Sequence, residues 1–289
     1  MEIGMIGLGR MGSNMAQRLS SGGHRVIAYD KDVDARLRIS SLEISTATSI
    51  SELIAKLSPP RCVFSMLPSG EPTENTIALL KDGLSTGDTV LDGGNANYKD
   101  SIRRYDLLSK HGINFLDVGI SGGIWGLDYG YSLMIGGDKP SFTRIEPIFQ
   151  TLSPTPDTGY SYVGRRGSGH FVKMVHNAVE YGMMQAYAEG FELMDAKSEF
   201  DLDLQTIAET WRFGSVVRSW LLDLTSEALS GEHNLNNLEG YVEDSGEGRW
   251  AVQESVDLAV PTPVTTLSLF ERFSSRQNNP LRRRLLAAL

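Results

Sequence analysis

The stretch EIGMIGLGRMG (residues 2–12) decides the fold class, because an apolar run leads directly into three closely spaced glycines. Gly7, Gly9 and Gly12 form the pattern G-x-G-x-x-G, and an amphipathic stretch follows. In a strand–turn–helix unit the first glycine permits the tight turn, the second lets the backbone approach a pyrophosphate, and the third lets helix and strand pack closely. Unpaired N–H groups at the start of the helix favour phosphate. We therefore expect a dinucleotide-binding turn, with cofactor contacts from Gly7, Leu8, Gly9, Arg10, Met11 and Gly12.

An acid after the next apolar run indicates which dinucleotide is bound. Asp30 follows the run RVIAY at residues 25–29. A carboxylate at this place accepts hydrogen bonds from the adenosine ribose hydroxyls and repels a 2′-phosphate. We therefore expect NAD as the cofactor, with NADP less favoured, and the adjacent Lys31 would weaken that preference. The alternative is a tight strand–helix turn in an α/β protein of another kind.

Short apolar runs alternate with amphipathic stretches over the first part of the chain. This alternation is typical of βαβ units and a mostly parallel sheet. The expected strands are residues 2–7, 25–30, 61–67, 89–92, 114–120, 132–135 and 160–163, and expected helices include 11–21, 50–57, 73–80 and 101–111.

The pattern becomes helical after Gly164. Residues 168–196 contain no proline and no turn cluster, which predicts one helix of about 28 residues. We therefore expect an α/β Rossmann-type dinucleotide-binding domain at residues 1–164. An all-helical domain for substrate binding and oligomerisation is expected at residues 165–289.

The composition excludes several classes of protein. Apolar residues make up 40% of the 289-residue chain, so a substantial core is expected, and the formal net charge of -9 disfavours general nucleic-acid binding. No apolar stretch approaches the roughly 20 residues of a membrane helix, and the first residues do not resemble a signal peptide. The single cysteine, Cys62, lies in an apolar run. It excludes an internal disulfide, fits a buried strand residue better than a nucleophile, and fits a reducing cytoplasm.

An anionic substrate would need a local concentration of cations. The candidates occur late in the chain and are Arg249, Arg272, Arg276, Arg282, Arg283 and Arg284.

The expected long helix carries a short polar stripe. Lys173, His176, Asn177 and Glu180 follow one another at helical spacing, so they fall within one arc of about 100°. Further along, the same arc becomes apolar at Met184, which favours a cleft over a solvated face. A lysine in a cleft can have its pKa lowered by desolvation and act as a base, and a carboxyl group about 10 Å along the axis can act as an acid.

These motifs resemble the decarboxylating 6-phosphogluconate dehydrogenases of the β-hydroxyacid dehydrogenase superfamily, over nearly the whole chain. The shared stretches are GLGRMGSNMA (7–16), LDGGNANY (91–98), the SGG of VGISGGIWG (118–126), YSLMIGG (131–137), GSGHFVKMVHNAVEYGMMQ (167–185) and GEGRW (246–250). Other β-hydroxyacid dehydrogenases share the glycine turn, the SGG segment and the lysine, but usually have a paired asparagine beside that lysine. The pair His176-Asn177 and Glu180 therefore favour the sugar-acid branch.

The resemblance implies oxidation of the C3 hydroxyl of 6-phosphogluconate with NAD, loss of CO2 and formation of ribulose 5-phosphate, a step of gluconate utilisation and the pentose phosphate pathway. Carried over, Lys173 takes the hydroxyl proton and then polarises the new carbonyl, while Glu180 protonates C1 of the enediol. A β-keto acid has its own electron sink, so no metal is expected. The implied substrate contacts are Asn95, Ser121, Gly122, Gly123, His176, Asn177, Tyr181, Arg249 and Arg272, and the implied contacts beside the nicotinamide half are Leu67, Pro68 and Asn95.

Two departures from the long form of the family bear on the phosphate pocket. The long form has a lysine where Arg249 stands, although arginine also binds phosphate bidentately. The chain ends at Leu289, too short for a duplicated helical domain and the C-terminal tail that enters a neighbouring subunit. We therefore expect the short, NAD-linked form, as a homodimer or homotetramer. The basic cluster at residues 282–284 either completes the pocket or is a solvated end.

Two other functions stay open from the sequence. One is a β-hydroxyacid dehydrogenase for an unphosphorylated acid such as 3-hydroxyisobutyrate, or for another sugar acid. The other is a dinucleotide-binding protein without catalysis, for which the pair Lys173 and Glu180 would have no use.

Overall fold

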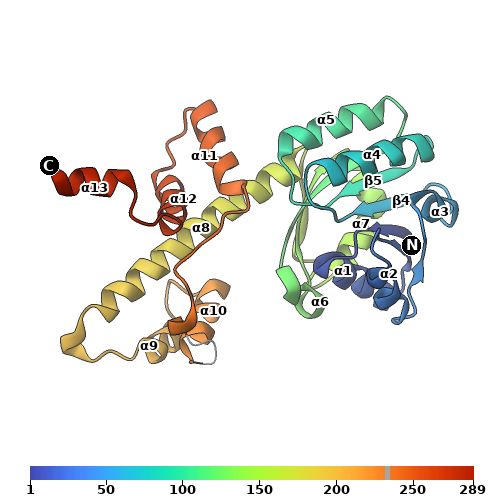
Figure 1. Cartoon of the computed structure of the whole chain (residues 1–289). Coiled ribbons are helices and arrows are strands. Elements are labelled where there is room, and N and C mark those ends of the chain that lie inside the picture. The colour runs from blue at the N-terminus through green and yellow to red at the C-terminus, as the bar shows by residue number, and fades with distance from the viewer. Residues whose placement is uncertain (232–234) are drawn as a thin grey trace. The chain divides into compact units, whose positions relative to one another are not determined.

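The computed structural model describes residues 1–231 and 235–289 (Figure 1). By packing, the chain divides into an N-terminal unit, Met1–Lys173, and a C-terminal unit, Met174–Leu289. This division falls inside one helix. The sequence instead places a domain boundary near residue 164, and that boundary stays a prediction.

Residues 1–173, all of them described, contain one eight-stranded sheet with the order β3-β2-β1-β4-β5-β6-β7-β8. The strands from β3 to β6 are parallel, β7 runs antiparallel to β6, and β8 is parallel to β7. The mostly parallel sheet predicted from the sequence is therefore confirmed. The strand bounds are β1 Glu2–Ile6, β2 Arg25–Tyr29, β3 Ser45–Thr46, β4 Cys62–Ser65, β5 Thr89–Asp92, β6 Asn114–Ser121, β7 Ser132–Gly137 and β8 Tyr160–Gly164.

Helices cover both faces of this sheet. Successive strand residues point to opposite sides, and apolar side chains on both sides need to be buried. In β1, Met5 packs in a core with residues of α1, α2 and α7, whereas Ile6 packs in a second core with residues of α3, α4 and α5. The helices predicted near α1, α3, α4 and α5 are confirmed, and α2, α6 and α7 are further helices. The bounds are α1 Arg10–Ser21, α2 Val33–Ser40, α3 Ile50–Ala55, α4 Glu71–Gly83, α5 Tyr98–Ser109, α6 Gly126–Tyr129 and α7 Lys139–Leu152.

The strand order reverses between β1 and β4, since β2 and β3 lie on one side of β1 and β4 lies on the other. In open α/β sheets, ligands bind at such a switch point, beyond the carboxyl ends of the strands. The segments that leave β1, β2, β4, β5 and β6 all start at this edge, because these strands are parallel.

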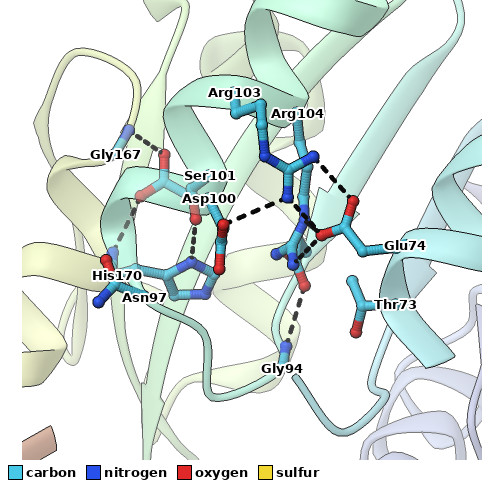
Figure 2. A network of polar contacts seen from close by, with 12 residues as sticks. Thr73, Glu74, Gly94, Asn97, Asp100, Ser101, Arg103, Arg104, Gly167 and His170 are labelled. Atoms are coloured by element: carbon cyan, nitrogen blue, oxygen red, sulfur yellow. Dashed lines mark hydrogen bonds and ion pairs between the residues drawn. The ribbon is translucent and has the colours of Figure 1, made fainter. Parts of the chain in front are cut away.

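A buried ion pair holds the end of β5 against α5. Arg104 has no exposed side-chain surface, and its Nη1 donates to Asp92 Oδ2 at 2.7 Å. The other oxygen of Asp92 accepts from the Gly94 N–H at 3.3 Å, so the carboxylate also holds the turn that leads to Asn95. Glu74 of α4 binds both Arg104 and Arg103 (Figure 2). Their hydrogen bonds lower the pKa of Glu74 to about 2, and the bond from Arg103 has the larger effect.

A second buried carboxylate holds the start of α8, Ser168–Asp195. Asp117 of β6 accepts from the Gly167 N–H at 2.7 Å and from the His170 N–H at 2.9 Å. A negative charge near a helix N-terminus is favoured by the helix dipole. The His170 ring also forms a hydrogen bond to α5, between Nδ1 and Ser101 Oγ at 2.7 Å (Figure 2).

The C-terminal unit is helical in its described residues, and the expected all-helical region is confirmed. It contains the rest of α8 and the helices α9 Leu204–Trp211, α10 Trp220–Leu229, α11 Glu247–Asp257, α12 Pro263–Ser275 and α13 Leu281–Ala288. Within the part of the chain that the structure describes, no helix combines the length and apolar character of a membrane span.

Replacing Arg104 with methionine should lower the free energy of unfolding by about 3–5 kcal/mol, because Asp92 then remains buried without a countercharge. The matched variant Arg103→Met loses the same Glu74 partner, but its guanidinium is 54% exposed, so a loss below about 1 kcal/mol is expected. Urea denaturation followed by circular dichroism measures both variants. Equal losses would contradict the role given to the buried pair.

Candidate functional site

The glycine turn has the geometry that a bound dinucleotide requires. Gly7 has φ +92°, which favours glycine, and a Cβ on Gly12 would lie only 1.9 Å from the Gly7 carbonyl oxygen. These two glycines are therefore required by the fold itself. A Cβ on Gly9, in contrast, would meet nothing within 4 Å, and no side chain caps the first turn of α1. The protein leaves open the space above Gly9 and the N–H groups at the start of α1, which fits a pyrophosphate.

Asp30 is held beside this turn by main-chain donors. Its Oδ2 accepts from the Leu8 N–H at 2.6 Å and its Oδ1 accepts from the Asp32 N–H at 2.9 Å. A carboxylate has about four lone-pair positions, so acceptor capacity is left for ribose hydroxyls. Arg36 Nη1 donates to the main-chain oxygen of Asp30 at 2.6 Å, which places a cation beside the same segment.

The segments after β4 and β5 pack directly on each other. A Cβ on Gly94 would lie 2.3 Å from the Leu67 carbonyl oxygen, so only glycine permits this approach. The Pro68 carbonyl oxygen accepts from Thr73 Oγ1 at 2.7 Å, which fixes the segment to the start of α4. Asn95 follows this turn and is exposed.

The segment Ser121-Gly122-Gly123 ends β6 at the same edge. Gly122 has φ +132° and Gly123 has φ +55°, conformations that other residues rarely adopt. Asn14 of α1 holds the following segment, because its Nδ2 donates to the Ile124 carbonyl oxygen at 3.1 Å. The segment is thus anchored to the helix that begins at the glycine turn.

Lys173 lies close to β6, because its Cβ packs against the backbone at Gly119. A Cβ on Gly119 would lie 2.5 Å from the Cβ of Lys173, and a Cβ on Gly169 would lie 2.2 Å from the Asp117 carbonyl oxygen. The first turn of α8 can approach the sheet this closely only because both positions are glycine. This register of α8 against β6 sets the position of Lys173, which is half-buried.

In the C-terminal unit, α8 continues with the polar residues predicted there. Asn177 Nδ2 donates to Glu247 Oε1 at 2.7 Å, and Asn177 Oδ1 lies 3.0 Å from His176 Nδ1. Glu180 Oε2 is 3.9 Å from the same His176 nitrogen. Tyr181 is buried, and its hydroxyl accepts from the Ser245 N–H at 3.2 Å.

Three arginines of the C-terminal unit contact either Asp244 or the ring of Tyr181. Asp244 binds Arg249 at 2.7 Å and Arg276 at 2.6 Å, and these two guanidinium groups lower the pKa of Asp244 to about 2. Arg272 lies over the Tyr181 ring, with its guanidinium carbon 3.7 Å from the ring centroid. The group carries three positive charges against one negative charge, as a site for an anion requires.

Cys62 and the basic cluster at residues 282–284 do not belong to the polar residues of α8 or to the arginine group. The Cys62 thiol is buried, and burial raises its pKa to about 12, which leaves it unreactive. Arg282 binds Ser274 and Gln277, and no residue of α13 is buried. Among residues 1–231 and 235–289 no cluster of acids, histidines and cysteines could hold a metal ion.

Comparisons with known proteins decide the family. The family model described as the NAD binding domain of 6-phosphogluconate dehydrogenase matches residues 2–164, and the model of the C-terminal domain of 6-phosphogluconate dehydrogenase matches residues 169–286. The chain belongs to the 6-phosphogluconate dehydrogenase family. The family resemblance predicted from the sequence is therefore confirmed.

Individual members of the 6-phosphogluconate dehydrogenase family agree with this assignment. A Haloferax volcanii protein named 6-phosphogluconate dehydrogenase, NAD(+)-dependent, decarboxylating is 41% identical over 99% of this chain and 94% of its own length. The solved Plasmodium falciparum 6-phosphogluconate dehydrogenase is 28% identical with a TM-score of 0.87, and the match covers 95% of this chain and 62% of that chain. A Mycobacterium tuberculosis 3-hydroxyisobutyrate dehydrogenase shares the fold, at 21% identity and a TM-score of 0.76 over 95% of this chain and 94% of that chain.

Several residues that shape this family site were not singled out from the sequence. Asp92, Arg104 and Asp117 hold the segments that carry predicted site residues, and Glu247 holds Asn177. A signal was available, because an acid inside an apolar run, as in TVLD and NFLDVG, needs a buried partner. The identity of each partner depends on tertiary packing, which a single sequence does not reveal.

The variants Gly9→Ala and Gly12→Ala should separate cofactor binding from stability. Gly9 has φ −62° and open space around its Cβ position, so Gly9→Ala should change the free energy of unfolding by less than about 1 kcal/mol. Its methyl group would occupy the space of the pyrophosphate, and NAD affinity should fall about 100-fold or more. Gly12→Ala should cost about 1–3 kcal/mol of stability through its clash with Gly7. Titration calorimetry and thermal unfolding measure the two effects, and NAD binding by Gly9→Ala at the parent affinity would exclude this site.

Proposed function

We propose that this protein oxidatively decarboxylates 6-phosphogluconate to ribulose 5-phosphate and CO2, with reduction of NAD. The observation that carries the proposal is the polar face of α8, where Lys173, His176, Asn177 and Glu180 follow one another at helical spacing. Family membership supports the reaction, and the Haloferax relative is named for it.

Lys173 takes the proton of the C3 hydroxyl. Bound NAD+ supplies the acceptor for the hydride that leaves C3. The ammonium group of Lys173 then donates a hydrogen bond to the new C3 carbonyl oxygen and stabilises the negative charge that develops there when the C1 carboxylate leaves as CO2. The product of that step is an enediol with the proton of Lys173 on its C3 oxygen.

Glu180 completes the reaction as an acid. It donates a proton to the carbon that has lost CO2, which becomes C1 of ribulose 5-phosphate, while the neutral amine of Lys173 takes the proton from the enediol oxygen and the ketone forms. Glu180 is 41% exposed and lies two turns along α8 from Lys173, so the two groups act on different carbons of one small substrate.

The remaining substrate contacts fall into two groups. We assign the carboxylate and hydroxyl groups of the sugar acid to Asn95, Ser121, Gly122, Gly123, His176 and Asn177. The phosphate is assigned to Arg249, Arg272 and Tyr181, with Arg276 as an addition that the structure suggests. Arg276 shares Asp244 with Arg249, so its guanidinium adds positive charge to the same group.

The arginine group argues against the alternative substrates. An unphosphorylated acid such as 3-hydroxyisobutyrate offers no second anion, whereas Asp244 balances only one of the three positive charges of the arginine group. A non-catalytic dinucleotide-binding protein has no use for the pair Lys173 and Glu180.

NAD is the favoured cofactor because Asp30 presents a carboxylate at the ribose position. A 2′-phosphate at this place would face that negative charge at short range. Lys31 and Arg36 oppose the preference with positive charge, so NADP is bound less well rather than excluded.

We further propose that the enzyme works in the cytoplasm, in gluconate utilisation and the pentose phosphate pathway, as a homodimer or homotetramer. Large exposed apolar side chains of the C-terminal unit support association with a second copy of the chain. They include Leu193, Phe213, Val256, Val264 and Leu267.

The parent protein should convert 6-phosphogluconate labelled with ¹³C at C1 into equal amounts of labelled CO2 and NADH. Lys173→Met should lower kcat by about 10²–10⁴-fold, the contribution of a general base. Lys110→Met removes an exposed lysine and should keep the parent rate. NADH without labelled CO2, or turnover of 3-hydroxyisobutyrate alone, would contradict the proposal.

Asp30→Asn should lower the ratio of kcat/KM with NAD to kcat/KM with NADP by about tenfold or more, because the charge that repels a 2′-phosphate is lost while one acceptor oxygen remains. Asp34→Asn makes the same change of charge at an exposed position of α2 and should leave the ratio unchanged. Steady-state kinetics with both cofactors give the result. An unchanged ratio in Asp30→Asn would refute this role.

A further inference from the structure

One buried carboxylate of the C-terminal unit has no part in the reaction as described above. Glu247 is 1% exposed and is the first residue of α11. The adjacent Gly248 packs on the Tyr181 ring, where a Cβ would lie 2.8 Å from the ring. Glu247 therefore lies at the N-terminus of α11, where the helix dipole favours negative charge.

The hydrogen bond from Asn177 fixes the orientation of the Asn177 amide. Its Nδ2 lies 2.7 Å from Glu247 Oε1. An ionised carboxylate only accepts hydrogen bonds, so the NH2 group of Asn177 must face Glu247 and its carbonyl oxygen must face the other way.

The amide oxygen of Asn177 in turn selects one tautomer of His176. Asn177 Oδ1 is 3.0 Å from His176 Nδ1, and an amide oxygen only accepts. The hydrogen of the neutral imidazole is therefore on Nδ1. Glu180 Oε2, 3.9 Å from Nδ1, is too far for a hydrogen bond and leaves Asn177 as the partner of this nitrogen.

We infer that Glu247 is a positioning residue, which acts through Asn177 to keep a lone pair on His176 Nε2. The His176 side chain is 38% exposed, and this lone pair accepts a hydrogen bond from a hydroxyl group of the substrate. The inference rests on the proposed function for the identity of that hydroxyl. Without Glu247, the Asn177 amide can rotate and present its NH2 group to Nδ1, and the hydrogen then moves to Nε2, which becomes a donor toward the substrate.

The ring tautomer can be measured without substrate by long-range ¹H–¹⁵N NMR of histidine side chains, with His176→Gln used to assign the signals. The parent protein should show His176 protonated on Nδ1 and bare on Nε2 at a pH where the ring is neutral. Glu247→Gln should keep this state, because its side-chain oxygen accepts from Asn177 as the carboxylate does. Glu247→Leu should shift the ring toward the Nε2–H tautomer, and Glu271→Leu, a change at an exposed acid of α12, should not.

Kinetics provide a second readout. In Glu247→Leu the KM for 6-phosphogluconate should rise by about 10- to 100-fold, because the hydrogen bond from the substrate hydroxyl to His176 Nε2 is lost. The KM for NAD should stay unchanged. In Glu247→Gln both KM values should equal those of the parent protein. An Nε2–H ring in the parent protein would overturn the inference even if Glu247→Leu does not fold. An unchanged ring in a folded Glu247→Leu would overturn it as well. Failure of the proposed reaction is distinguishable, because it would appear as absent CO2 release in the parent protein while the NMR result still decides the role of Glu247.

Discussion

The site depends on the close approach of the first turn of α8 to the backbone of the sheet. Side chains cannot fit between them, because a Cβ on Gly119, Gly136 or Gly169 would lie within 2.2–2.7 Å of neighbouring atoms. Asp117 supplies the attraction by accepting two N–H groups at the start of the helix. The helix α8 and the strand β6 are thereby held in one register, and this register sets the position of Lys173.

A buried ion pair likewise holds the segment that follows β5 in place. Arg104 and Asp92 stabilise the end of β5 with no exposed side-chain surface, so the turn before Asn95 has one arrangement. A buried pair of this kind is costly to separate and adds little as a source of net stability. Its value lies in the unique geometry that it imposes. Glu247 has the corresponding role in the C-terminal unit, where it orders Asn177 by a single hydrogen bond.

The sequence predicted what depends on local pattern. Short apolar runs that alternate with amphipathic stretches were enough for the mostly parallel sheet, glycine spacing for the tight turn after β1, and a stretch without proline or turn clusters for a helix of 28 residues. All three signals are local properties of the sequence. The antiparallel β7 and the partners of Asp92, Asp117 and Asn177 were not predictable, since each contact joins residues far apart in the chain. Arg276 was recognised only as a cation, and its pairing with Asp244 required the packing of α12.

The most direct test of the account is a crystal structure of the protein with 6-phosphogluconate and NADH, a pair that cannot react. The account predicts Lys173 Nζ within hydrogen-bond distance of the C3 hydroxyl oxygen, about 2.6–3.2 Å, with the register of α8 against Gly119 unchanged. A C3 hydroxyl held by another side chain, with Lys173 directed away from the substrate, would contradict the central claim that this register places the catalytic base.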